Sequence, residues 1–283
     1  MPKGTLAIKR QLKSIANTKK ITKAMELVSA SKMRRAVGAV LSARPYAQAA
    51  NEIMTKVAGN DNERENTFFV QRPVSKKAII VISSNRGLCG GFNNNVVQKA
   101  LSIAREEGVA TDVIALGRKG RDGLARNGYN AAFDFDKKDV TSSASDVVGL
   151  IKTAVAGYEK GEYDMVELVY THFVSAMSQK TTIKQLLPIT VEENTKLKSE
   201  HIFEPSKNEV LMKLIPRLLE TQVFQAVLES EASEHSARML AMRNANSSAS
   251  DMFFDLQLAY NQARQAGITQ EIAEISSGAA AMQ

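Results

Sequence analysis

The sequence has no tryptophan, a single cysteine (Cys89) and only six prolines among its 283 residues. One cysteine excludes an intrachain disulfide framework and any metal site made of four cysteines, and it fits a reducing compartment best. Apolar runs are also short: none approaches the roughly 20 residues that a transmembrane helix needs. No apolar segment follows Met1, so we expect no signal peptide. The composition is otherwise that of an ordinary soluble protein. If the protein acts at a membrane, we expect it to bind at the membrane surface without spanning it.

What the sequence does have is an uneven distribution of charge. Residues 1–57 contain twelve Lys or Arg and two acids, a net charge of +10, whereas the whole chain carries +7. The rest of the chain is therefore slightly acidic. A basic segment on a nearly neutral body suggests an acidic partner, which could be a protein, a nucleic acid or an anionic membrane face.

The basic N-terminal region has the pattern of one long helix. A narrow, sustained apolar stripe favours pairing with a second long helix over covering a broad core. We expect this helix to reach about Val57, with a kink or local opening at Pro45. The stripe consists of apolar or small residues that recur mostly every three or four positions: Ile8, Leu12, Ile15, Thr22, Met25, Ser29, Met33, Ala36 and Val40.

Strand-like and helix-like segments alternate in the middle of the chain. This order predicts an α/β domain over residues 75–190, with a Rossmann-like sheet that ends in an antiparallel pair. The expected strands cover 77–83, 112–116, 131–135, 165–171 and 181–189, and the expected helices cover 94–107, 119–127 and 145–160.

A second long helical pattern begins near residue 208 and continues almost to the end. Pro216 marks either its true start or a kink, and residues 244–250 are so poor in helix formers that local propensity alone would break it. Unbroken, this helix would be about 110 Å long. We therefore expect residues 208–283 to form an antiparallel coiled coil with residues 1–58. The C-terminal tip would extend beyond that pair into an apolar socket of a partner.

The Gly-rich turn after the first predicted strand does not match a nucleotide-binding motif. Gly87, Gly90 and Gly91 lack the spacing of a dinucleotide fingerprint, and no phosphate-binding P-loop motif occurs elsewhere. Cys89 could be a nucleophile near a helix N-terminus, but no catalytic signature accompanies it, and a buried structural thiol is the favoured interpretation. His172, His201 and His235 do not have metal-ligand spacing. We expect no catalytic residue, no cofactor and no metal.

Three blocks of sequence, taken together, closely resemble the gamma subunit of the F-type ATP synthase. They are ITKAMELVSASKM (21–33), SNRGLCGGFN (84–93) and, at the end, ARQAGITQE (263–271) with EISSGAAA (274–281). The blocks occur in the family's order and cover the full length of the chain. The family fold is an antiparallel coiled coil of both terminal helices with an α/β domain inserted between them, in agreement with the patterns above.

The resemblance implies a function. Such a subunit is the central rotor shaft inside a ring of three alpha and three beta subunits, together with an epsilon subunit, and its foot stands on the membrane ring of c subunits. The shaft itself would not be catalytic. We expect no transit peptide before Met1, which favours a bacterial source over an organelle precursor. The protein would then be peripheral to the cell inner membrane, on its cytoplasmic side. The foot would be the α/β domain with the link 198–205.

The resemblance also implies which residues couple rotation to catalysis. Met25, Arg238, Gln265, Thr269 and Glu271 are similar to coupling residues that lie where the two helices meet and face the beta subunits. Arg264 and Gln265 are similar to a pair that hydrogen-bonds a beta-subunit loop.

Two other functions compete with this interpretation. The first is a basic coiled-coil adaptor or nucleic-acid-binding protein, although no recognition fold or aromatic platform is visible and we expect no nucleic-acid partner. The second is a small-molecule enzyme built on the α/β domain, for which no catalytic constellation is present.

Overall fold

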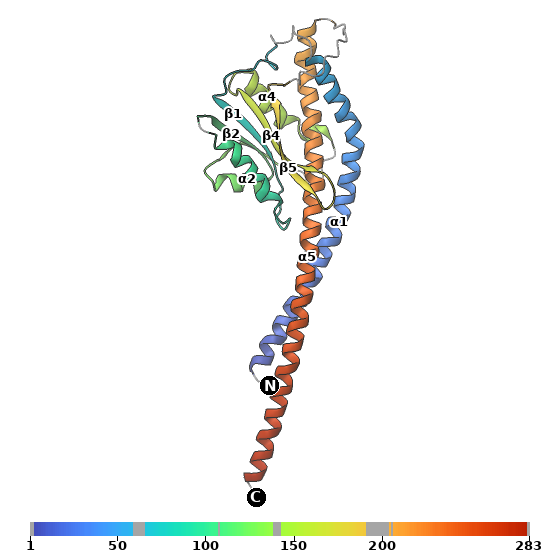
Figure 1. Ribbon diagram of the computed structural model, residues 1–283, viewed down its shortest axis with the longest axis vertical. Helices are drawn as coiled ribbons and strands as arrows, with labels where there is room; N and C mark the ends of the chain where they lie inside the picture. Colours follow the sequence, from blue (N-terminus) through green and yellow to red (C-terminus); the bar gives the residue numbers. More distant parts are fainter. Residues whose placement is uncertain are drawn as a thin grey trace. The chain divides into compact units, whose positions relative to one another are not determined.

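The computed structural model describes residues 3–58, 66–106, 108–137, 143–190, 204 and 206–281. These described residues form eleven elements in chain order: α1 (Lys3–Ala58), β1 (Lys76–Ile82), α2 (Phe92–Ala104), β2 (Ala110–Leu116), α3 (Arg118–Ala125), β3 (Ala131–Phe135), η2 (Ala144–Asp146), α4 (Val148–Glu159), β4 (Met165–Phe173), β5 (Gln179–Leu187) and α5 (Lys207–Ala281) (Figure 1). The expected α/β order is confirmed, although the helix expected over 145–160 is divided into η2 and α4.

The chain forms two compact units, and each is described by itself. The terminal-helix unit contains Met1–Ser29 of α1 and Met239–Gln283 of α5, and the sheet unit contains Ala30–Arg238. The division therefore runs through both long helices.

The sheet unit is built on five strands in the order β3-β2-β1-β4-β5. β1 pairs in parallel with β2 and β4, β2 pairs in parallel with β3, and β5 closes the sheet antiparallel to β4. The predicted antiparallel pair at the end of the sheet is thus confirmed. The continuous apolar run of β1 is explained by its central position, because both of its faces are covered.

Alternate residues of β1 enter two different cores. Ile80 and Ile82 pack on the side of α4 and α5, and Ile79 and Val81 pack on the side of α2 and α3. Successive side chains of a strand point to opposite faces, so one short run contributes to two apolar layers.

Within the sheet unit, α1 and α5 pack antiparallel. Ala36 and Val40 of α1 share a small cluster with Ala232 of α5, while Gln222, ten residues earlier on α5, donates to Asn51 Oδ1 at 2.6 Å. As residue numbers increase along α1, the residues that they contact on α5 decrease in number, so the two helices are antiparallel, as expected from the sequence.

The terminal-helix unit has a narrow contact made of small and polar side chains. The stripe is confirmed here, since Leu12, Thr22 and Ser29 are buried. Asn246 of α5 donates to Lys19 O at 2.8 Å and to Thr22 Oγ1 at 3.2 Å. Asn246 lies in the segment 244–250, which is poor in helix formers, and these hydrogen bonds hold that segment against α1. α5 continues through it because tertiary contacts outweigh local helix propensity.

Neither internal proline interrupts its helix. α1 continues through Pro45, so the expected opening is absent there, and α5 begins at Lys207, before Pro216. A proline leaves the carbonyl four residues earlier without its helical donor. Those carbonyls belong to Leu41 and Met212, which are both exposed, so water can reach the residues that lose a bond.

Candidate functional sites

The Gly-rich turn between β1 and α2 is held by its own side chains. Ser84 Oγ donates to Arg86 O at 2.6 Å, and the Ser84 N–H donates to Asn93 Oδ1 at 3.1 Å. Asn93 Nδ2 in turn donates to Cys89 Sγ at 3.1 Å. Leu88 has a positive φ of 61° and is 63% exposed. The turn therefore presents one apolar side chain to solvent from a constrained backbone.

Cys89 is a structural residue of this turn. Its side chain is 2% exposed, and burial raises its pKa. A raised pKa keeps the thiol protonated at neutral pH, which is the opposite of what a nucleophile requires. The sequence-based preference for a buried thiol is confirmed.

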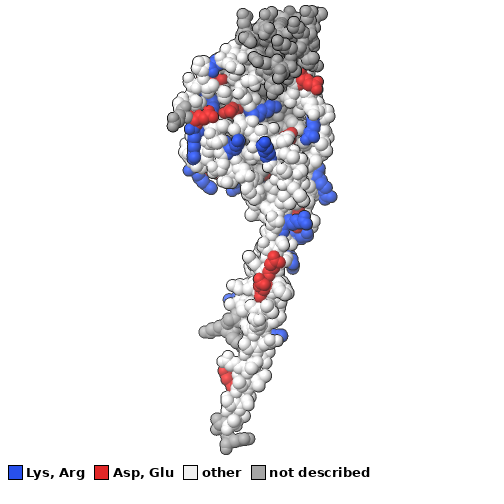
Figure 2. All heavy atoms as spheres, viewed as in Figure 1, with Lys and Arg blue, Asp and Glu red and all other residues white. Residues whose placement is uncertain are grey.

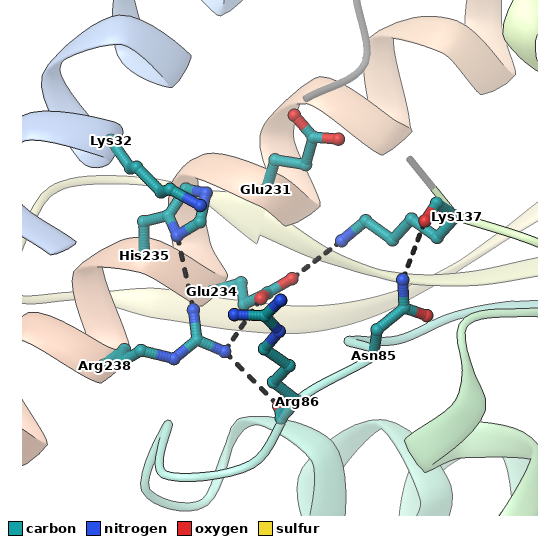
Figure 3. Close-up of a pocket in the computed structure, with 8 residues that line it drawn as sticks. All are labelled: Lys32, Asn85, Arg86, Lys137, Glu231, Glu234, His235 and Arg238. Carbon is teal, nitrogen blue, oxygen red and sulfur yellow. Dashed lines mark hydrogen bonds and ion pairs between the residues drawn. The ribbon is translucent and has the colours of Figure 1, made fainter. Parts of the chain in front are cut away.

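A buried network of charges lies against this turn, and its centre is Glu234 of α5. Lys137, which follows β3, lies 2.7 Å from Glu234 Oε2, and Arg238 lies 2.8 Å from Glu234 Oε1. Figure 3 shows the Glu234 carboxylate between the two cations. We call the eight residues that line the small pocket here the charge cluster: Lys32, Asn85, Arg86, Lys137, Glu231, Glu234, His235 and Arg238.

The network changes the acidity of two of its members. Burial alone would raise the pKa of Glu234, but the charges of Lys137 and Arg238 outweigh it and hold that pKa at about 2. Burial lowers the pKa of His235 to about 4; Arg238, Lys137 and Lys32 add to this effect, while Glu234 opposes it. At neutral pH the glutamate is therefore charged and the histidine is neutral.

The charge cluster occupies the place where open α/β sheets usually bind ligands. The chain leaves β1 towards β2 on one side and later adds β4 on the other, so the switch point lies between the carboxyl ends of β1 and β4. Here α5 covers that edge: Ser233 Oγ donates to Thr171 O of β4 at 3.3 Å, and Arg238 contacts the turn after β1. The remaining pocket is about 40 Å³, room for a few waters and far below the roughly 300 Å³ of small-molecule sites.

The histidines have ordinary partners. His172 of β4 lies 2.5 Å from Glu229 of α5, and His235 belongs to the charge cluster, while His201 lies outside the described residues. Within the described part of the chain, no group of three or more His, Cys, Asp or Glu is placed to hold a metal ion.

Arg238, one of the predicted coupling residues, lies in the sheet unit and is 9% exposed. Its hydrogen bonds run to Glu234 and to the backbone of the Gly-rich turn. The sequence analysis named Arg238 but not Glu234 or Lys137, and it interpreted His235 only as a histidine without metal-ligand spacing. The sequence did contain one signal for this pair. Glu234 and Arg238 are four residues apart on a helix, a spacing that lets an acid and a base pair, and the residues around them are small.

The other five predicted residues lie in the terminal-helix unit. Met25 is half-buried, and because Asn246 contacts Thr22, the antiparallel pairing sets Met25 near residue 243 of α5. Arg264, Gln265, Thr269 and Glu271 are exposed on α5, beginning about 30 Å further along that helix. The structure does not bring Met25 together with these four.

Helical spacing divides the four exposed residues between two faces. At about 100° per residue, Arg264 and Glu271 share one face, and Gln265 and Thr269 share another. Every residue from 268 to 280 is exposed, including Ile268, Ile272 and Ile275 at 48%, 62% and 73%. On the face drawn in Figure 2, the C-terminal part of α5 carries few charges. The tip is thus an apolar, weakly charged rod, as the sequence predicted.

A groove of the terminal-helix unit was not expected from the sequence. Its volume is about 670 Å³, and its wall combines three lysines with apolar and small side chains: Ala16, Lys19, Lys20, Lys23, Ala24, Leu27, Asn246 and Phe253. The sequence signal was the basic pattern at positions 19, 20 and 23, which places its cations on one side of a helix.

The fold and these surfaces define a class of protein: a two-helix stalk with an α/β domain, related to ATP synthase. The family model described as ATP synthase matches residues 5–282. The ATP synthase gamma chain of Pelotomaculum thermopropionicum is 44% identical over 281 residues, which cover 98% of each chain. That of Chloroflexus aurantiacus is 42% identical over 282 residues, which cover 97% of each chain. The chain belongs to the ATP synthase gamma chain family and is thus a subunit of an enzyme complex.

Solved structures have the same fold at low sequence identity. A chain of the mitochondrial ATP synthase of Euglena gracilis, solved as the OSCP/F1/c-ring assembly, has a TM-score of 0.71 and 18% identity, covering 99% of this chain and 94% of that one. A chain of the Tetrahymena thermophila central stalk and c-ring has a TM-score of 0.63 and 24% identity, covering 80% and 99%. Among the described residues, no helix is both long and apolar enough to cross a membrane.

Proposed function

We propose that the chain is the non-catalytic rotor shaft of a bacterial ATP synthase, peripheral to the inner membrane on its cytoplasmic side. Its partners would be three alpha and three beta subunits, an epsilon subunit and the c-subunit ring. The observation that carries this proposal is the match to gamma chains across 98% of both sequences. The α5 tip supports it, because a helix with exposed isoleucines at 268, 272 and 275 fits an apolar socket in a partner better than open water.

The shaft would act by differential contact. Three beta subunits of identical sequence would meet different faces of an asymmetric rod, so each face would stabilise a different conformation of the catalytic site. Residues 1–58 and 208–283 would form the shaft, and residues 75–190 with the link 198–205 would form the foot. No cofactor or metal is needed for this role, because the free energy comes from contacts that change with rotation.

We further propose coupling roles for the exposed residues of α5. Arg264 and Gln265 would hydrogen-bond a loop of the beta subunit, and Thr269 and Glu271 would add contacts on the same stretch of helix. Few other long polar side chains are available there, which favours these four as the polar contacts of an otherwise small and apolar rod.

Reconstitution tests the proposal. The purified chain would be mixed with alpha and beta subunits from the same source, and complex formation and ATP hydrolysis would be followed. We expect one copy of this chain per three of each partner and a rise in hydrolysis. No complex and no change in rate would reject the shaft role.

Truncation tests the socket. Removal of residues 274–283 should weaken assembly and leave the unfolding of the sheet unit unchanged, because the described side chains of this segment, residues 274–280, are exposed and belong to the terminal-helix unit. Full assembly of the truncated chain would count against the socket.

A charge at Met25 tests coupling. Met25→Lys would place a cation at a packed helix contact among basic neighbours, and we expect less ATP made per proton with hydrolysis partly retained. Met252 is 55% exposed on α5, so Met252→Lys is the matched control. Equal coupling in both variants would remove Met25 from the coupling residues.

A further inference from the structure

Arg238 has almost no hydrogen-bonding capacity left for another subunit. A guanidinium has five N–H donors. Nε donates to Gly87 O at 3.3 Å, and Nη2 donates both to Arg86 O at 3.3 Å and to Glu234 Oε1 at 2.8 Å. Nη1 lies 3.3 Å from His235 Nδ1, which can accept while His235 is neutral. Four of the five donors are therefore used inside the chain, at a residue that is 9% exposed.

The bonds of Arg238 hold the tip of the Gly-rich turn. Its acceptors there are two consecutive backbone carbonyls, those of Arg86 and Gly87. The Cα of Gly87 faces open space, with no atom within 4 Å of an added Cβ, and Leu88 beside it is mostly exposed. The guanidinium therefore attaches the backbone of the tip to α5 (Figure 3).

A second attachment of the same turn meets the first at Glu234. Asn85 Nδ2 donates to the backbone oxygen of Lys137 at 2.7 Å, and Lys137 Nζ lies 2.7 Å from Glu234 Oε2. Each carboxylate oxygen of Glu234 thus contacts one cationic side chain. Arg238 bonds the turn through its guanidinium, and Lys137 bonds it through its backbone oxygen. Removal of this one carboxylate should loosen both attachments.

We propose that Arg238 is a positioning residue, which serves coupling by holding the Arg86–Gly87 backbone against α5, and that Glu234 is the residue that orients it. The proposal rests on the proposed shaft function. It differs from the role that the resemblance implies for Arg238, because here Arg238 acts through the turn and not through a contact with a beta subunit.

The chain contains its own probe for this idea. Cys89 is the single cysteine of the sequence and is buried within the turn, so its rate of reaction with an aromatic disulfide reagent reports opening of the turn. In the isolated full chain we expect Arg238→Gln and Glu234→Gln each to raise that rate about tenfold, and the double variant to raise it little more. Arg238→Lys should give an intermediate rate, because an ammonium cannot reproduce the guanidinium fork.

Electrostatics alone cannot produce this pattern. The Arg238 charge lowers the pKa of Cys89, and the Glu234 charge raises it. Without opening, Arg238→Gln would therefore slow the thiol and Glu234→Gln would speed it. Faster reaction in both variants supports opening, and opposite changes would overturn the proposal.

Two controls separate local opening from unfolding. Arg217 lies on α5 with its side chain 74% exposed, and Arg217→Gln should leave the rate unchanged. Denaturant should have little effect on a local opening and a large effect on global unfolding. A rate that follows global unfolding in Arg238→Lys as well as in Arg238→Gln would overturn the proposal.

The assembled complex supplies the second readout, ATP-driven proton pumping relative to hydrolysis. Arg238→Gln and Glu234→Gln should lower that ratio alike. A loss confined to Arg238 variants, with normal coupling in a fast-reacting Glu234→Gln, would show direct contact with another subunit and reject the positioning role. If the unchanged chain neither assembles nor pumps, the shaft function fails while the thiol result stands by itself.

Discussion

Two segments of α5 differ in a way that their polarity does not predict: one buries charged side chains, and the other exposes apolar ones. From 226 to 236 every residue is buried, although three of them are glutamates, Glu229, Glu231 and Glu234. From 268 to 280 every residue is exposed, although three of them are isoleucines. Two of these carboxylates have partners inside the sheet unit: Glu234 contacts Lys137 and Arg238, and Glu229 contacts His172. Exposure along this helix is thus decided by which partners are present, and polarity by itself does not predict it.

The strongest way to break this contrast is to remove a buried charge. Glu234→Gln would leave the ammonium of Lys137, 4% exposed, without its counter-charge and should lower the free energy of unfolding by about 4 kcal/mol. Glu274→Gln, in the exposed tip, should change it by less than about 0.5 kcal/mol. Tyrosine fluorescence during urea unfolding measures both, because the chain has no tryptophan. Equal losses would mean that the buried pair contributes no more than a surface one.

Acid should reveal the buried segment through His235. Its pKa falls from 6.5 to about 4 on folding, so the folded state binds this proton only at a lower pH than the unfolded state does. Stability is therefore full above pH 6.5 and should fall by about 3 kcal/mol as the pH drops to 4. The groups that face His235 are Glu234, Arg238, Lys137 and Lys32. Glu234 adds its own loss only below its ordinary pKa of 4.5.

His235→Gln separates these contributions, since glutamine can still accept a hydrogen bond and does not titrate. Unfolding of both proteins would be measured between pH 7.5 and pH 4.5. We expect the variant to lose less stability across that interval. Parallel curves would assign the acid sensitivity to other groups.

Packing can sharpen the comparison without any charge. Ala232 is fully buried in a cluster with Ala36 and Val40, so Ala232→Leu should overpack the α1–α5 contact and cost about 2 kcal/mol. Ala279→Leu, at an exposed position of the same helix, should cost nothing measurable. Urea midpoints of the two variants give the difference, and a tolerated leucine at 232 would show that the contact can widen.

The smallest effect is expected at the tip itself. Ile272 is 62% exposed, so Ile272→Asp should change the free energy of unfolding by less than about 0.5 kcal/mol in the isolated chain. The same variant should reduce assembly with alpha and beta subunits, because a carboxylate would enter an apolar socket. Unchanged assembly would indicate that this face of the tip stays in water.

Much of the fold could be predicted from local patterns. The apolar run near Ile79–Ile82 identified a central strand, because only a strand covered on both faces tolerates such a run. The stripe that includes Leu12 and Thr22 identified the helix pair. The exposed tip followed from the unequal lengths of the two terminal helices.

Local patterns did not predict the candidate site equally well. Arg238 was selected by resemblance, and its bonds to the turn depend on residues about 150 positions earlier. Glu234 and Lys137 are separated by 97 residues, so no spacing rule could pair them. The segment at 244–250 stayed helical for a similar reason, since Asn246 is stabilised by α1.

The sequence by itself determined the elements and the family, because periodicity, strand composition and the three blocks of residues are local properties of the chain. Only the tertiary structure decided that α5 covers the switch point of the sheet and that Glu234 joins Lys137 to Arg238. Those facts depend on the register between distant segments. That register is set by the sum of many small packing and desolvation free energies, and no single stretch of sequence contains it.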